Sequence, residues 1–162
     1  CRHSDASLCD NPRFTTFELR IPLERDWVAG ASVAVYEGFV DGTRVVAGDL
    51  LRYRWPPMQT QDGTAPDFVT ARAASGPTLT VVPRGLPSAF DGVIVRAGAP
   101  LLAGDCVIVT FGDRSQGSPG YRIPDIGITS DLQIEQDPDG DGLYAAPSHP
   151  APRLRVSGMR VD

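Results

Sequence analysis

Residues 106–122 read Cys-Val-Ile-Val-Thr-Phe-Gly-Asp-Arg-Ser-Gln-Gly-Ser-Pro-Gly-Tyr-Arg, and this stretch decides the fold. Its first part, Val107–Phe111, carries β-forming side chains, apolar at both odd and even positions, which is typical of a strand covered on both faces. A loop with three glycines and one proline follows directly. The pattern predicts a buried strand that presents a stiff, charged loop at one end of the molecule, an arrangement common in β-sandwiches.

Other segments with strand character recur along the chain, separated by turn-forming residues. In Phe17–Leu23 apolar residues alternate with Glu18, Arg20 and Pro22, as expected for a strand with one buried face. No amphipathic helix of useful length is present. Further strands are predicted at 33–35, 51–55, 68–73, 79–82, 93–97, 126–128, 132–134 and 154–156.

These segments predict an all-β chain that folds as a single antiparallel β-sandwich, immunoglobulin-like or jelly-roll, with about seven to nine strands. The sandwich would span residues 13–162, after an N-terminal arm at residues 1–12. A chain of 162 residues has the size of one domain. The residues expected in its core are Phe17, Leu19, Ile21, Val33, Val35, Leu51, Tyr53, Val81, Val95, Val107, Val109, Leu132 and Ile134.

The charge of the chain narrows the classes of partner. The net charge is −5 and the pI is about 4.9, whereas nucleic-acid binding needs a dense basic surface. All 15 basic residues are arginine, and several alternate with apolar residues in the predicted strands, as on a solvated sheet face. No apolar run is long enough for a transmembrane segment. We therefore expect a protein partner or a neighbouring domain, and no nucleic acid.

The three cysteines bear on the cellular compartment. Cys1 and Cys9 lie close together in the N-terminal arm and are predicted to form a disulfide, whereas Cys106 is expected to be a buried thiol in a core strand. The odd number leaves other pairings open. Cys1 is alternatively the lipidated first residue of a processed lipoprotein. An exported bacterial protein, periplasmic, cell-surface or extracellular, fits these features.

The loop 112–122 is the predicted contact surface. Its serine lacks the Gly-x-Ser-x-Gly spacing of a nucleophile elbow, and no helix follows that could bind a phosphate. We expect a rigid loop braced by an ion pair of Asp113 with Arg114 or Arg122. The residues expected to contact a ligand or partner are Asp113, Arg114, Ser118, Tyr121 and Arg122, with Trp55 at the border of another loop.

A candidate metal site lies in residues 137–142, which read Asp-Pro-Asp-Gly-Asp-Gly. Aspartates at alternate positions followed by glycine match the first half of a calcium-binding loop, so Asp137, Asp139 and Asp141 are the candidate Ca²⁺ ligands. The twelfth position, which needs a bidentate Glu, is Ser148, so the segment is not an EF-hand. A polar hairpin without any ion is the alternative, because Asp and Gly form turns by themselves.

Catalysis has little support in the sequence. The two histidines, His3 and His149, have no plausible partner nearby in the chain, so neither a catalytic triad nor a His/Cys metal cluster is expected. Two carboxylates that meet only in space would suffice for glycoside hydrolysis. A carboxylate-dependent glycan hydrolase is therefore kept as the least favoured alternative, and the chain is predicted not to be an enzyme.

The segments 101–105, 107–109 and 112–122, together with Asp137–Tyr144 leading to Leu154 and Val156, carry a resemblance to a known family. This part of the chain resembles the N-terminal region of large exported bacterial proteins of the domain-of-unknown-function family three-six-zero-four. The resemblance covers roughly residues 95–157 and implies a β-sandwich leader before a larger domain that looks like a metal-dependent phosphoesterase. None of that domain's ligand motifs occurs here, so no catalytic residue is carried over.

The sequence supports two candidate functions more strongly than the glycan hydrolase. The first is a non-catalytic exported accessory module that uses its end loops to dock onto a partner domain or to bind an extracellular ligand. The second is a structural subunit of a cell-surface or filamentous assembly, in which exposed strand edges and the N-terminal arm link copies of the chain. The stiff loop 112–122 favours the first.

Overall fold

The structure is a computed structural model that describes residues 14–40, 58, 60–84, 92–122, 128–148 and 153–156. Every regular element within these ranges is a β-strand, which confirms the all-β prediction. In the same ranges we find no helix of the length and apolarity needed to cross a membrane. The strands are β1 (Phe14–Thr15), β2 (Phe17–Pro22), β3 (Ser32–Val40), β4 (Val69–Ala73), β5 (Thr78–Pro83), β6 (Gly92–Arg96), β7 (Cys106–Phe111), β8 (Tyr121–Arg122), β9 (Ile128–Asp137) and β10 (Arg153–Val156).

Eight of these strands form one antiparallel sheet in the order β10-β9-β3-β6-β5-β4-β7-β2. The remaining two, β1 and β8, form a small antiparallel sheet of their own. The register of β2 against β7 places Phe17 opposite Phe111 and Pro22 opposite Cys106. The loop that follows β7 therefore lies at one end of the strands, and the loop that follows β2 lies at the other.

The side-chain pattern explains why β7 is central and β2 is at the edge. In β7 the side chains of Val107, Ile108, Val109 and Phe111 are all buried, as the apolar residues at both odd and even positions predict. It pairs with β4 on one side and β2 on the other. In β2 buried and exposed residues alternate, which is the pattern of a strand with one solvated face.

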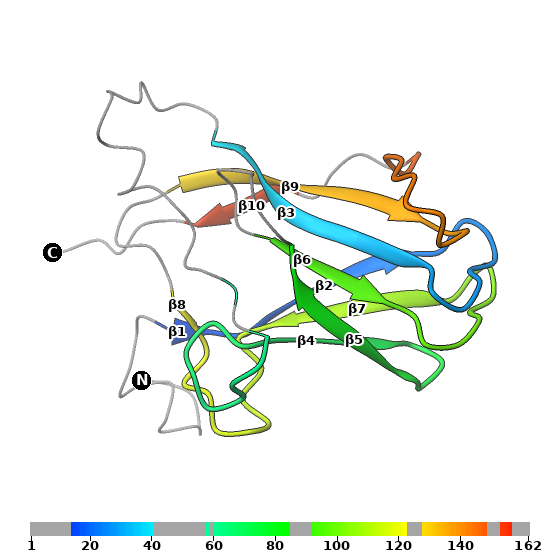
Figure 1. Ribbon diagram of the computed structural model, residues 1–162. Coiled ribbons are helices and arrows are strands. Elements are labelled where there is room, and N and C mark those ends of the chain that lie inside the picture. Colours follow the sequence, from blue (N-terminus) through cyan, green and yellow to red (C-terminus); the bar gives the residue numbers. More distant parts are fainter. Residues whose placement is uncertain are drawn as a thin grey trace, which may run out of the picture.

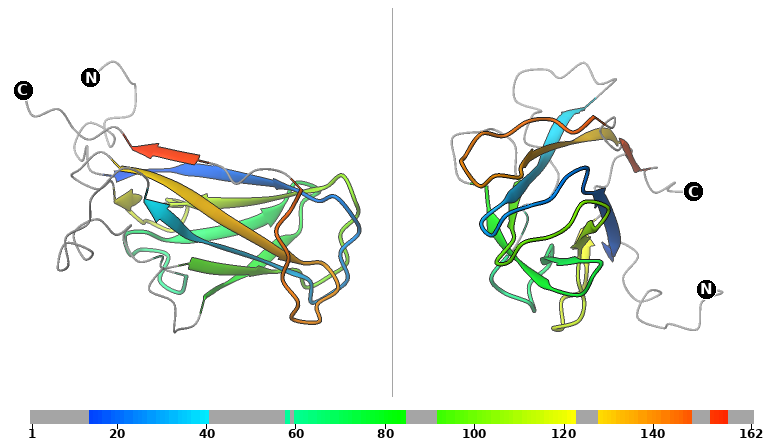
Figure 2. Two further views of the ribbon diagram at one scale, coloured as in Figure 1. Left: turned by 90° about the horizontal axis from the view of Figure 1, so that it is seen from above. Right: turned by 90° about the vertical axis from the view of Figure 1, so that its right-hand side faces the viewer.

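The large sheet curls, so that β3 and β9 lie across the core from β2 and β7 (Figures 1 and 2). The curl is made at β5, whose first residues pair with β4 and whose later residues pair with β6. Side chains from both sides of the curl belong to one hydrophobic cluster. Of the residues expected in the core, those found buried are Leu19, Ile21, Val33, Val35, Val95, Val107, Val109, Leu132 and Ile134, with Phe17 and Val81 partly buried against them.

Some predictions lie outside the described residues, and two elements were not expected. The predicted strand 51–55, with the core candidates Leu51 and Tyr53, lies outside those ranges, as does the arm 1–12. The strands β1 and β8 are only two residues long each, and Tyr121 and Arg122 were expected in a loop. Two residues are too few to show an alternating pattern in the sequence, so these strands could not be predicted from it. They form because β1 and β8 pair with each other.

Candidate functional site

The loop 112–122 connects β7 to β8 and is held firmly at its base. The backbone N–H groups of Gly112 and Asp113 both donate to the carbonyl oxygen of Phe68, at N–O distances of 2.8 and 3.0 Å. Gly112 has φ +71°, and a Cβ at this position would lie 2.2 Å from the backbone nitrogen of Tyr121 and 2.5 Å from the carbonyl oxygen of Thr15. Only glycine fits between these backbones, so the loop leaves β7 in one defined direction.

Asp113 stabilises the loop through hydrogen bonds, and the predicted ion pair of Asp113 with Arg114 or Arg122 is wrong. Its Oδ2 accepts from the hydroxyl of Thr70 at 2.6 Å, and its Oδ1 accepts from the backbone N–H of Ser115 at 2.8 Å. Burial raises the pKa of Asp113, but the bonds from Thr70 and Ser115 outweigh it and hold the pKa below its usual value. Within the described part of the chain Asp113 forms no salt bridge with Arg114 or Arg122.

Arg122 pairs instead with Asp67, a residue that the sequence did not single out. The Nε of Arg122 donates to Oδ2 of Asp67 at 2.6 Å, its Nη2 lies close to the same oxygen, and its backbone N–H donates to Oδ1 at 2.7 Å. Asp67 is 0% exposed and has φ +65°, a conformation that is unfavourable for a residue with a side chain. This contact fastens the loop 60–68 to β8.

Arg114 differs from Arg122 because its guanidinium pairs with no acidic residue in the part of the chain that the structure describes. None of the salt bridges among the described residues includes Arg114. Its Nε is buried and makes no hydrogen bond, an uncommon state for a guanidinium N–H group. The loop around it is held in place by Asp113 and by a bond from the N–H of Gly117 to the carbonyl oxygen of Arg114 at 3.1 Å. The site thus presents one unpaired cation on a rigid loop.

Two other residues expected to contact a ligand are in the interior. Tyr121 is 1% exposed and packs edge-on against the rings of Phe17 and Phe111, at centroid distances of 5.7 and 5.8 Å. Ser118 is buried too, and its hydroxyl accepts from the N–H of Gly120 at 3.1 Å. Both therefore stabilise the loop from inside and do not form its outer surface. Trp55 lies outside the described residues.

The aspartates of the candidate calcium site form a turn after β9. The carboxylate of Asp137 is buried and accepts from the N–H groups of Asp141 and Gly142 at 3.1 and 2.9 Å. Asp139 forms a salt bridge with Arg25, and Asp141 accepts from the N–H of Leu143. Within the described ranges no three acidic, His or Cys side chains are grouped as metal ligands. Calcium binding stays a prediction, which a calcium titration followed by thermal melting would decide.

The cysteine predictions are tested only at Cys106. Cys106 opens β7, is half-buried and is a free thiol, so it is more accessible than a core thiol would be. Its Sγ lies 3.7 Å from the carbonyl oxygen of Val107. Cys1 and Cys9 lie outside the described residues, so their disulfide and the lipid anchor stay predictions.

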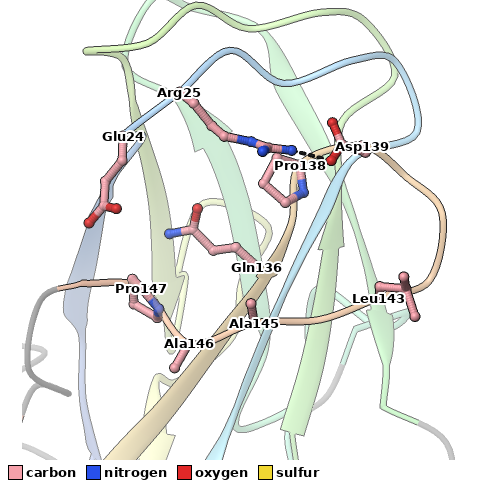
Figure 3. Close-up of a pocket in the computed structure, with 9 residues that line it drawn as sticks. All are labelled: Glu24, Arg25, Gln136, Pro138, Asp139, Leu143, Ala145, Ala146 and Pro147. Atoms are coloured by element: carbon pink, nitrogen blue, oxygen red, sulfur yellow. Dashed lines mark hydrogen bonds and ion pairs between the residues drawn. The ribbon is translucent and has the colours of Figure 1, made fainter.

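A pocket of about 260 Å³, here called the Gln136 pocket, is shown in Figure 3. The turn after β9, which supplies part of its lining, lies at the opposite end of the strands from the loop 112–122 (Figure 1). The pocket lies between the loop after β2 and the connection from β9 to β10. Gln136 is 7% exposed, and its Nε2 is buried without a hydrogen-bond partner. Sequence reasoning missed this pocket because its walls come from distant parts of the chain. The lining residues are Glu24, Arg25, Gln136, Pro138, Asp139, Leu143, Ala145, Ala146 and Pro147.

Among the described residues three buried polar atoms make no hydrogen bond, and two of them lie in the places described above, whereas the third, Nε1 of Trp27, belongs to a core residue. The first of these places is the loop 112–122 with the unpaired Arg114, and the second is the pocket with the unpartnered amide of Gln136. Neither arrangement identifies a reaction by itself. In comparisons with known proteins the chain matches no family model, no curated protein and no solved structure.

Proposed function

We propose that this chain is a non-catalytic exported module that docks onto a partner domain, or binds an extracellular ligand, through the loop 112–122. In this proposal the curled sheet is a single β-sandwich, immunoglobulin-like or jelly-roll, and it carries binding loops at its ends. The partner is another protein or a neighbouring domain of a longer chain. The resemblance of residues 95–157 to the leader of exported bacterial proteins supports the second case.

The observation that carries the proposal is the unpaired guanidinium of Arg114 on a rigid loop. Guanidinium groups bind carboxylates and phosphates through two parallel hydrogen bonds, and such charge-assisted bonds are stronger than neutral ones. Because Asp113 and the base of the loop already have their own partners, binding would require little rearrangement. Arg114 is half-buried and its Nε is inaccessible, so an anionic group on the partner would pair with the terminal N–H groups of its guanidinium.

The non-catalytic part of the proposal rests on the sequence. Its two histidines, His3 and His149, stand far apart in the chain, and no nucleophile motif accompanies them. The structure adds one physical argument for the loop as a contact surface. Of the two arginines in the loop 112–122, Arg122 is occupied by Asp67, which leaves Arg114 to recognise a partner.

The test is selection of binding peptides from a random displayed library, followed by affinity measurement on purified protein. We expect acidic peptides to be selected, and Arg114→Ala to weaken them about tenfold or more, the effect of losing a charge-assisted hydrogen bond. Arg114→Lys should recover only part of the affinity, because lysine lacks the planar fork. The matched control is Arg72→Ala, which removes an exposed arginine of β4.

Two results would contradict the proposal. One is a set of selected peptides whose affinity Arg114→Ala leaves unchanged, because binding would then occur elsewhere. The other is a library that yields no binder to the folded protein. Arg122→Ala is not a suitable probe of binding, because Arg122 is the partner of the buried Asp67 and its loss would disturb the loop itself.

A further inference from the structure

Two neighbouring loops, residues 23–31 and 97–105, expose an apolar surface. Among the described residues three large apolar side chains are exposed, and two of them lie on these loops, Val28 at 46% and Leu102 at 71%. Every residue from 98 to 103 is apolar, and all but one are exposed, whereas loops normally present polar side chains to water. The exposed residues form one surface, here called the Leu102 patch: Val28, Ala29, Ala99, Pro100, Leu102 and Ala103.

Backbone pairing brings the two halves of the Leu102 patch together. Trp27 and Leu101 form an antiparallel bridge, in which each N–H group donates to the carbonyl oxygen of the other residue, at 2.8 and 3.0 Å. Their side chains are buried and belong to the hydrophobic cluster. Because side chains alternate along paired extended segments, the next residues, Val28 and Pro100, lie opposite each other and face outward.

Further backbone bonds hold the patch on both sides of this bridge. On one side the N–H of Gly30 donates to the carbonyl oxygen of Ala97 at 2.8 Å, and the N–H of Ala97 donates to that of Ala31 at 2.9 Å. On the other side the N–H of Gly104 donates to the carbonyl oxygen of Leu23 at 2.9 Å. The apolar surface is therefore fixed before a partner arrives, which lowers the conformational entropy lost on binding.

Two carboxylates flank Leu102. Asp26 lies opposite Leu102 in the register described above, and its Oδ1 accepts from the N–H of Ala103 at 2.8 Å. Asp105 follows Leu102 in the same loop, and its N–H donates to the carbonyl oxygen of Leu102 at 3.1 Å. None of the salt bridges in the described part of the chain includes Asp26 or Asp105. The patch thus has an apolar centre with negative charge beside it.

This charge distinguishes between the possible occupants of the patch. A second copy bound through the same patch would bring the acidic flanks of both copies together, and like charges across an interface disfavour binding. A bilayer that contains anionic lipids would repel the same carboxylates. A protein surface with aliphatic side chains at its centre and basic side chains around them complements both the apolar and the acidic part.

We propose that the Leu102 patch is a docking surface for a protein that presents aliphatic side chains flanked by lysine or arginine. The loop 97–105 leads into β7 at Cys106, whereas the loop 112–122 follows Phe111 at the other end of the same strand. The inference is therefore independent of the function proposed for the loop 112–122. If both sites bind, the module connects two partners, one at each end of its strands.

The test uses fluorescently labelled synthetic peptides composed of leucine and lysine, titrated with the purified protein and followed by fluorescence anisotropy. One peptide places its leucines on one face of a helix, and the other alternates leucine and lysine as in a strand. We expect at least one of them to bind with a Kd of roughly 10–100 µM, in the range of small transient interfaces. The same peptides with glutamate in place of lysine should bind about tenfold more weakly or not at all.

Two variants locate the binding. Leu102→Ser should weaken binding of the leucine–lysine peptide about tenfold, because an exposed leucine can no longer be buried against the partner. Asp26→Asn keeps the oxygen that accepts from Ala103 but removes the charge. It should weaken binding about threefold at low salt and make the affinity less dependent on salt.

Leu143→Ser is the matched control, because Leu143 is 75% exposed but belongs to the turn 138–145. The loop 23–31 lies between that turn and the loop 97–105 (Figures 1 and 2). This variant should bind the peptide as the wild type does, and so should Arg114→Ala, which affects only the site proposed on the loop 112–122. All four variants change exposed or loop side chains, and their melting temperatures check that the fold is kept.

Five outcomes would overturn the proposal. Three concern the peptides: no binding of either leucine–lysine peptide, binding that Leu102→Ser leaves intact, and equal binding of the lysine and glutamate peptides. The fourth is binding to phosphatidylcholine vesicles, with or without phosphatidylglycerol, that Leu102→Ser abolishes, since the patch would then insert into a bilayer. The fifth is a dimer in sedimentation velocity that Leu102→Ser dissociates, since the patch would then join two copies of the chain.

Discussion

At the scale of single residues, the buried pair of Asp67 and Arg122 shows how one contact can fasten two loops. Asp67 is fully buried, whereas the side chain of Arg122 is 49% exposed. A buried carboxylate without its cation would be costly, and Asp67 also keeps a strained backbone conformation at φ +65°. Arg20 and Glu18 of β2 also form an arginine–carboxylate ion pair, but both of these side chains are exposed.

Arg122→Met should therefore destabilise the protein much more than Arg20→Met. We expect a loss of about 3 kcal/mol in the free energy of unfolding for Arg122→Met, below the full value for a buried pair because water reaches Arg122. Arg20→Met should change it by less than about 0.5 kcal/mol. Urea unfolding of the two variants measures both values, and equal losses would contradict the structural role given to Arg122.

At the scale of elements, Asp105 connects the β4–β5 hairpin to the start of β7. Its Oδ2 accepts from the hydroxyl of Ser75 at 2.6 Å, and its Oδ1 accepts from the N–H groups of Cys106 and Ser75 at 2.7 and 3.2 Å. The bond from the Ser75 hydroxyl is the main reason that the pKa of Asp105 lies below its usual value; burial opposes it, and the backbone N–H groups add to it.

This lowered pKa predicts a loss of stability in acid. A carboxyl whose folded pKa lies below its unfolded value of about 3.9 stabilises the fold above that pH, and the contribution is lost as the pH falls through the folded pKa. The pKa of Asp113 is also lowered, so Asp113 likewise contributes stability that is lost in acid. In Asp105→Asn the decrease of the unfolding free energy between about pH 4 and pH 2 should be shallower than in the wild type.

Urea unfolding at a series of pH values measures this slope. Ser75→Ala, which removes the hydroxyl donor, should reduce the slope in part, since the backbone N–H groups still donate to Asp105. An identical slope in the wild type and Asp105→Asn would show that Asp105 does not contribute to the acid sensitivity of the fold.

At the scale of the whole molecule, an aromatic cluster joins the two sheets into one body. Phe17 of β2 and Phe111 of β7 stack at a centroid distance of 4.8 Å, and Tyr121 of β8 meets both rings edge-on. Tyr121 is therefore part of the same hydrophobic cluster as the strands of the large sheet. Aromatic pairs in this geometry contribute beyond the area that they bury.

Tyr121→Ala should accordingly lower the stability of the entire fold, by about 3–5 kcal/mol, as expected for the loss of a large buried side chain. We expect a single unfolding transition by far-ultraviolet circular dichroism and by near-ultraviolet signals alike. Leu143→Ala is the control, because Leu143 is 75% exposed and should change stability by less than about 0.5 kcal/mol. A separate early transition in the wild type would indicate that β1 and β8 unfold independently.

The sequence by itself determined most of the longer strands and which of their faces are buried, but not the short strands β1 and β8 or the continuous course of β9. The alternation in β2 and the apolar run in β7 are properties of neighbouring residues, so they can be read without knowing what lies opposite. Those patterns were sufficient to predict the all-β class and nine of the 21 buried residues in the hydrophobic cluster of the described part of the chain. They indicated the loop 112–122 as well, because glycines and proline mark it locally.

Only the tertiary structure decided which side chains meet. Arg122 pairs with Asp67, 55 positions away, and not with its neighbour Asp113. Long-range packing of the same kind buries Tyr121. It also brings Gln136 into one pocket with Glu24 and Arg25, which follow β2. The physical reason is that pairing and burial depend on how the sheet curls, and contacts between residues distant in the chain leave no periodic signal along it.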